Sequence, residues 1–128
     1  ELLKTTELSL HKGIEQLKGG VKVGTVAAAI EAVLNKHHYG VVKDLVGHGV
    51  GHHVHEEPNI PNYGRVGTGP VLHSGMTIAI EPMATLGTDR VYCEQDGWTI
   101  KTADGSLSAH FEHTILITEQ GFEILTQL

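Results

Sequence analysis

The sequence has 128 residues, 40% of them hydrophobic, which suits the core of one ordinary domain but not of two. Lys and Arg number 9 against 15 Asp and Glu, the formal net charge is −6, and no basic cluster of the kind that binds phosphates occurs, so we expect no nucleic-acid partner. The single Cys93 cannot form an internal disulfide, and neither a secretory leader nor an apolar run of membrane-spanning length is present, so we expect a cytoplasmic protein without a membrane partner.

Two helices are expected in the first third of the chain. Apolar residues at roughly helical spacing predict a helix over residues 1–18, which Gly19 and Gly20 end. After a short extended link, Thr25 is the predicted N-cap of a second helix that ends at Gly40. Both helices are interpreted as covering one face of a sheet, and no chemistry is assigned to them.

From Val41 onward the apolar pattern has a period of two, which predicts strands over residues 41–46, 76–82, 91–95, 98–102, 107–118 and 122–126. Asp96-Gly97 lies between two of these runs and predicts a tight hairpin. Residues 59–75 are rich in Pro, Gly and Asn and are interpreted as a loop. The expected fold is α+β, with two helices followed by a largely antiparallel meander.

Residues 47–58 contain the densest group of chemically active side chains, with four histidines, two glutamates and three glycines. Alternating glycines let the backbone approach a neighbour closely and point a histidine at a fixed place. His48 is the main candidate in this segment. His52 and His53 are interpreted as a solvent-facing pair.

Glu81 and Glu112 stand in the apolar strands over residues 76–82 and 107–118, on the faces opposite the apolar ones. A charged glutamate there costs several kcal/mol, roughly, unless it is paired or binds a metal. Each could instead be an exposed edge residue or half of a salt bridge. Together with His48, they form a set that suits manganese, iron, cobalt or zinc.

Four motifs occur together in one order, and with them the chain resembles the C-terminal half of the methionine aminopeptidases. The motifs are Gly47-His48-Gly49-Val50-Gly51 with His55-Glu56-Glu57-Pro58, Gly75-Met76 leading to Ile80-Glu81-Pro82-Met83, Asp96-Gly97-Trp98-Thr99, and Ser108-Ala109-His110-Phe111-Glu112-His113-Thr114. The similarity covers essentially the whole chain and implies half of a pita-bread fold. Prolidases and aminopeptidases P share the histidine and glutamate motifs. They are not expected to carry Asp96-Gly97-Trp98-Thr99 together with the Ser108-Ala109 run, so the methionine-specific branch is favoured. The short interval between Glu81 and Glu112 is similar to that of the type I enzymes.

This resemblance implies a site for two divalent ions (Co, Mn, Fe or Zn), with His48, Glu81 and Glu112 as ligands. Glu112 would bridge the ions, and Glu81 would bind one ion and take the proton of the attacking water. His55 would be the catalytic histidine that hydrogen-bonds the substrate amide.

The resemblance also implies a substrate pocket for the methionine side chain, with Trp98 as part of its wall. Val54 stands where family members often have an aromatic residue, which implies a wider pocket here. The substrate would be the N-terminus of a nascent peptide.

In this family an N-terminal half supplies two aspartates, another histidine and much of the pocket, so residues 1–128 are interpreted as a single C-terminal half-domain. The helix that starts at Glu1 is consistent with a chain cut within the fold. We therefore expect weak metal binding and little or no turnover alone, and either the missing half or a second copy as partner. Two alternatives stay open: a peptidase for Xaa-Pro substrates, and a non-catalytic peptide-binding module. The presence of His48, His55, Glu81 and Glu112 together argues against the module.

Overall fold

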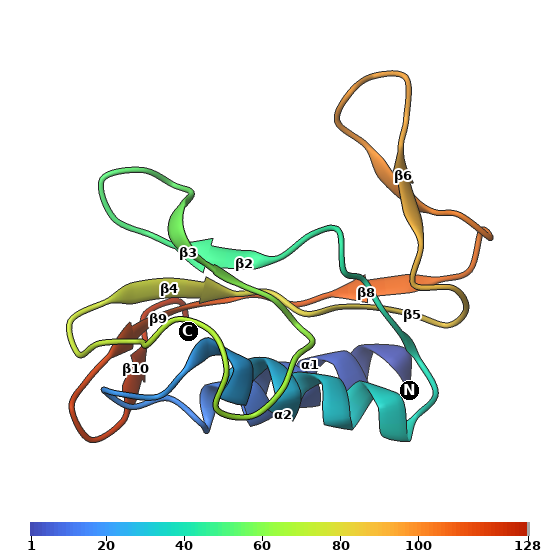
Figure 1. The fold of residues 1–128 in the computed structure, drawn as a ribbon. Coiled ribbons are helices and arrows are strands. Elements are labelled where there is room, and N and C mark those ends of the chain that lie inside the picture. The colour runs from blue at the N-terminus through green and yellow to red at the C-terminus, as the bar shows by residue number, and fades with distance from the viewer. Residues whose placement is uncertain (128) are drawn as a thin grey trace.

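Two helices pack on one side of antiparallel sheets in the computed structural model, which describes residues 1–127 (Figure 1). This confirms the expected α+β class. The elements are α1 (Leu2–Ile14), α2 (Val23–Lys36), β1 (Gly40–Val41), β2 (Gly47–Gly49), β3 (Glu56–Ile60), β4 (Thr77–Ile80), β5 (Met83–Thr85), β6 (Val91–Cys93), β7 (Ile100–Thr102), β8 (Ser108–His110), β9 (His113–Ile117) and β10 (Phe122–Ile124). Neither helix of the described chain is long and apolar enough to cross a membrane.

Both helices differ from their predicted bounds at the ends. The first ends at Ile14, and α2 begins at Val23 and ends at Lys36, so the prediction of Thr25 as N-cap is wrong. The first amides of α2 find loop acceptors instead, because Val23 N–H donates to the Pro70 carbonyl (3.0 Å) and Gly24 N–H to that of Thr68 (2.8 Å). Backbone carbonyls thus satisfy the donors that a capping side chain would otherwise satisfy.

One hydrophobic core lies between the helices and the sheets. The two helices approach closely at Gly13, where a Cβ atom would lie 2.7 Å from Cγ1 of Ile30. Both helices and the central strands contribute side chains that are at most 1% exposed, among them Leu10, Ile30, Leu34, Ile78, Ile80, Ile115 and Ile117. Their burial fixes which face of the central strands the helices cover.

The strands form a five-stranded sheet (β10-β9-β4-β2-β3), a three-stranded sheet (β1-β5-β8) and a two-stranded sheet (β6-β7), and all their pairs are antiparallel. The prediction of a meander is wrong, because β4 pairs with β2 rather than with its sequence neighbour β3. The β6–β7 hairpin extends from the side opposite the helices (Figure 1). Its turn is confirmed: the Asp96 carboxylate accepts hydrogen bonds from the Trp98 and Thr99 amides, both at 2.9 Å.

Two predicted strands are interrupted. Residues 42–46 leave the sheet between β1 and β2, and the run over residues 107–118 breaks at Phe111 and Glu112. The physical reason for the second break is a change of partner: β8 pairs with β5, whereas β9 pairs with β4. The predicted strand over residues 76–82 ends at Ile80 for the same reason, and β5 starts at Met83.

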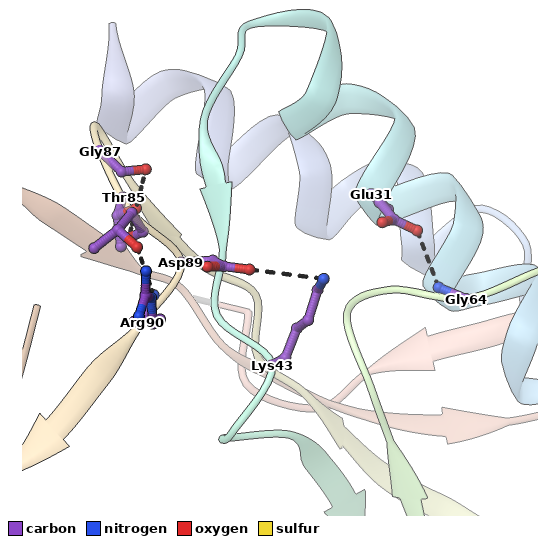
Figure 2. A network of polar contacts seen from close by, with 8 residues as sticks. Glu31, Lys43, Gly64, Thr85, Gly87, Asp89 and Arg90 are labelled. Atoms are coloured by element: carbon purple, nitrogen blue, oxygen red, sulfur yellow. Dashed lines mark hydrogen bonds and ion pairs between the residues drawn. The ribbon is translucent and has the colours of Figure 1, made fainter. Parts of the chain in front are cut away.

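Polar contacts hold the irregular segments onto this framework (Figure 2). The Glu31 carboxylate on α2 accepts a hydrogen bond from Gly64 N–H (3.0 Å), which fixes the loop between β3 and β4. Lys43 forms an ion pair with Asp89 (3.6 Å), which ties the segment after β1 to the loop after β5. Of these segments, the one after β1 also lines the cavity at the candidate site, through Val42 and Asp44.

Candidate metal centre

His48 lies in the middle of β2, between β3 and β4, and is 8% exposed. Cβ atoms at the flanking Gly47 and Gly49 would collide with the carbonyls of Ala79 and Glu57, so both glycines permit the close backbone approach expected from the sequence. The Nδ1 atom of His48 lies 2.9 Å from the Gly49 carbonyl oxygen. Since a carbonyl only accepts, Nδ1 carries a proton, which leaves Nε2 as the nitrogen that can bind a metal.

The two candidate glutamates lie where paired strands change partners, and we call this place the seam: Glu81-Pro82 between β4 and β5, and Phe111-Glu112 between β8 and β9. The pairing of Ile80 with His113 precedes the seam and that of Met83 with His110 follows it, so the two breaks face each other. A hydrogen bond from Phe111 N–H to the Pro82 carbonyl (3.3 Å) crosses the seam. This alignment brings together two carboxylates that are distant in sequence.

His48, Glu81 and Glu112 each offer a ligand atom, and these atoms lie within 4.8 Å of one another. The Nε2 atom of His48 is 3.4 Å from Oε1 of Glu81. A nitrogen lone pair and a carboxylate oxygen repel each other at that distance unless a proton or a cation lies between them. One imidazole and two carboxylates fit a divalent ion such as manganese, iron, cobalt or zinc, so the residues present suit the metal that the sequence predicts.

His110 is a member of this cluster that the sequence analysis did not single out. Its Nε2 atom lies 3.2 Å from Oε2 of Glu81, and its side chain is 47% exposed. The hydrogen bond to Glu81 raises the pKa of His110, and the negative charges of Glu81 and Glu112 add to that shift, while burial opposes it. The signal was present in the sequence, because strand alternation puts His110 on the same face as Glu112.

A cavity of about 1010 Å³ opens beside the cluster and is lined by His48, His55, Glu81, Trp98 and His110, among others. The ring of His55 is tilted by 54° relative to that of His48, with the ring centroids 4.2 Å apart, so the two histidines of the motif lie together. Trp98 reaches the cavity from the β6–β7 hairpin and is 87% exposed. His52 and His53 are exposed, as expected for a solvent-facing pair.

The sequence matches the model of Metallopeptidase family M24 over residues 1–119. The chain belongs to metallopeptidase family M24. Methionine aminopeptidase 1 of Bacillus subtilis is 47% identical over 128 residues, which are 100% of this chain and 52% of that protein. The crystal structure of the methionine aminopeptidase of Thermotoga maritima matches with a TM-score of 0.96 and 52% identity, over 99% of this chain and 51% of that chain. This M24 chain thus spans about half the length of the curated relatives it matches.

Prolidases share the fold of this M24 chain but are less similar. The prolidase of Pyrococcus horikoshii matches with a TM-score of 0.71 and 26% identity, over 98% of this chain and 30% of that chain. The resemblance to the methionine-specific branch is therefore confirmed, and the Xaa-Pro alternative is not favoured.

Proposed function

We propose that this chain is the C-terminal half-domain of a methionine aminopeptidase, which removes the N-terminal methionine from nascent polypeptides. The observation that carries the proposal is the cluster of His48, Glu81 and Glu112 at the seam, beside a cavity that His55 also lines. The similarity to methionine aminopeptidases along the whole chain supports it.

The three clustered side chains would hold the metal. His48 would hold an ion through Nε2, and, as the family resemblance implies, Glu112 would be shared by two ions and Glu81 would hold one. When bound, divalent ions supply Lewis acidity toward water and the scissile carbonyl. Glu81 would take the proton of the attacking water, since it is an accepting group within the cluster. The ions would be Co, Mn, Fe or Zn.

The substrate would occupy the cavity. His55 lines it next to His48 and is assigned as the catalytic histidine that hydrogen-bonds the substrate amide. Trp98 is assigned to the wall of the methionine pocket, since an exposed indole that lines the cavity gives a thioether a large contact. Val54 is 72% exposed and does not line the cavity in this chain, so the wider pocket stays a prediction.

The working enzyme would be larger than this chain. Three apolar side chains are more than 70% exposed, namely Val54, Trp98 and Leu107. Because the curated relatives are about twice as long as this chain, we assign these exposed side chains to contact with an N-terminal half. Without the N-terminal half, the chain would bind metal weakly and turn over little peptide. It would also tend to self-associate, which size-exclusion chromatography would detect. We place the protein in the cytoplasm, where nascent peptides are available.

A hybrid protein tests the activity directly. In it, this chain replaces the matching segment of the Bacillus subtilis relative, and release of methionine from a methionyl tripeptide is measured with Mn²⁺ or Co²⁺. We expect hydrolysis that disappears in the His55→Ala hybrid. A folded, metal-loaded hybrid that releases no methionine would refute the proposal, and hydrolysis of a Xaa-Pro dipeptide instead would identify the alternative peptidase.

A further inference from the structure

The carboxylate of Glu81 lies between two imidazoles that play opposite roles. Nε2 of His48 is 3.4 Å from Oε1, and Nε2 of His110 is 3.2 Å from Oε2. Nδ1 of His48 faces the Gly49 carbonyl and carries a proton, so in the neutral, metal-binding form of the ring Nε2 presents a lone pair to Oε1. An ionised carboxylate only accepts, so the contact at Oε2 requires an N–H on Nε2 of His110. One oxygen of Glu81 therefore has a donor and the other faces a second acceptor.

We infer that His110 is a positioning residue that makes Glu81 a one-oxygen metal ligand. Its hydrogen bond occupies Oε2 and turns Oε1 toward His48 and Glu112, where the cation would lie. The inference rests on the proposed function, because it gives His110 a task at a site that binds metal. Groups outside the coordination shell that hold a ligand in place are a common requirement of metal centres.

The backbone explains why His110 can do this. His110 is the last residue of β8 and pairs with Met83 of β5. This register places His110 just past Glu81, on the side of the seam that belongs to the three-stranded sheet. Glu81 is also held at its other end, because the fully buried Asn62 donates from Nδ2 to the Glu81 carbonyl oxygen (3.1 Å). With its main chain fixed by Asn62 and Oε2 fixed by His110, the Glu81 side chain has little freedom to choose another rotamer.

Two substitutions separate the hydrogen bond from the shape of the ring. His110→Phe keeps a ring of similar size but has no donor, whereas His110→Gln restores an N–H donor without the ring. His73→Phe is the matched control, since His73 is exposed and lies in the loop before β4. The side chain at 110 is about half exposed, so we expect all three variants to fold, and circular dichroism with thermal melting checks this.

The first measurement needs no metal. Side-chain scalar couplings of Glu81, measured by NMR on the metal-free chain, report whether it occupies one rotamer. We expect one rotamer in the unsubstituted chain, in His110→Gln and in His73→Phe, and averaging over several rotamers in His110→Phe. An unchanged single rotamer in His110→Phe overturns the inference.

The second measurement is Mn²⁺ affinity by calorimetry on the same four proteins. We expect a roughly 10- to 100-fold loss in His110→Phe, as for other groups that hold metal ligands. His110→Gln should recover most of it, and His73→Phe should match the unsubstituted chain. Equal affinity in His110→Phe, or equal loss in His110→Gln and His110→Phe, overturns the inference. An unsubstituted chain that holds Glu81 in one rotamer but binds no Mn²⁺, even as part of the hybrid, refutes the proposed function instead.

Discussion

His48 lies opposite Ala79 across the β2–β4 pair, and its imidazole meets the carboxylate of Glu81, which follows two residues later. The contact is thus a product of strand register. A slip of one residue between β2 and β4 would turn Glu81 to the other face of the strand and take it out of the cluster. Correct pairing of these two short strands is therefore a condition for any chemistry at this site.

The first prediction concerns the metal ligands. Glu81→Gln and Glu112→Gln each remove a negative charge and an acceptor oxygen from the cluster, so we expect Mn²⁺ affinity to fall at least about tenfold in calorimetric titration. Glu57→Gln is the control, because Glu57 carries the same charge on an exposed part of β3 outside the cluster. A comparable loss in Glu57→Gln would mean that the general negative charge, rather than the cluster, attracts the ion.

The second prediction concerns Gly49. A Cβ atom there would collide with the backbone carbonyl of Glu57, which cannot rotate away as a side chain could. We expect Gly49→Ala to lower the free energy of unfolding by about 1–3 kcal/mol, the usual cost of overpacking, and to weaken metal binding through His48. Urea denaturation measures the first effect. Gly121→Ala, at a turn with space for a Cβ atom, should unfold like the unsubstituted chain.

The third prediction concerns Leu72, a fully buried residue in the long loop before β4. Its amide and carbonyl bond to Val21 and Gly20, so the loop is fastened to the segment before α2 and its side chain fills the core. We expect Leu72→Ala to cost about 2–5 kcal/mol in urea denaturation. The neighbouring Val71 is 36% exposed, and Val71→Ala should cost clearly less. Equal costs would mean that the loop is not part of the core in solution.

The fourth prediction is a pH dependence. Hydrogen bonds from the Thr88 amide (2.8 Å) and the Ser106 amide (3.0 Å) lower the pKa of Asp104 from 3.8 to about 2. Because the pKa is lower in the folded state, the ionised carboxylate stabilises the native loop above pH 3.8, and this stabilisation is lost as the pH falls toward 2. NMR should show the Thr88 amide shift titrating with a midpoint near 2, and Asp104→Asn should abolish that transition. A midpoint near 3.8 would show that the hydrogen bonds do not persist in solution.

The fifth prediction separates substrate binding from folding at Trp98. Since this side chain is 87% exposed on the β6–β7 hairpin, we expect Trp98→Ala to change the free energy of unfolding by no more than about 0.5 kcal/mol. In the hybrid protein, kcat/KM for a methionyl peptide should fall at least about tenfold, which corresponds to roughly 1.4 kcal/mol of lost contact. Unchanged kcat/KM would remove Trp98 from the substrate pocket.

The sequence predicted which candidate side chains lie together better than it predicted the strand boundaries. His48, Glu81 and Glu112 stood out because charged and metal-binding side chains are unusual among apolar strand residues, and the structure brings all three together. Within residues 107–118, polar and apolar residues continue to alternate across Phe111 and Glu112. Nothing local therefore marks the point where β8 ends and β9 follows. That break depends on which strands lie alongside, and a period of two carries no information about partners.

His110 and Thr25 show the same limit. The role of Thr25 depended on loop carbonyls from Thr68 and Pro70, which are remote in sequence and took the place of a cap. His110 became relevant only when the pairing of β5 with β8 placed it beside Glu81. Alternation in the sequence puts His110 on the face of Glu112, but its contact with Glu81 depends on a distant segment, as does the helix start near Thr25, and a single sequence does not display such contacts.

At the seam a bound metal would be a mechanical link as well as a reagent. The candidate ligands come from β2 in one sheet and from the two junctions where the strands pass into the other, so an ion held by all three could bind only when both sheets have formed in register. An ion that binds only the folded state stabilises both sheets together, by about 2.7 kcal/mol at a concentration 100 times its Kd. Pulse proteolysis with and without Mn²⁺ would measure this gain. Metal supply would then govern how long the protein survives in the cell, in addition to how fast it works.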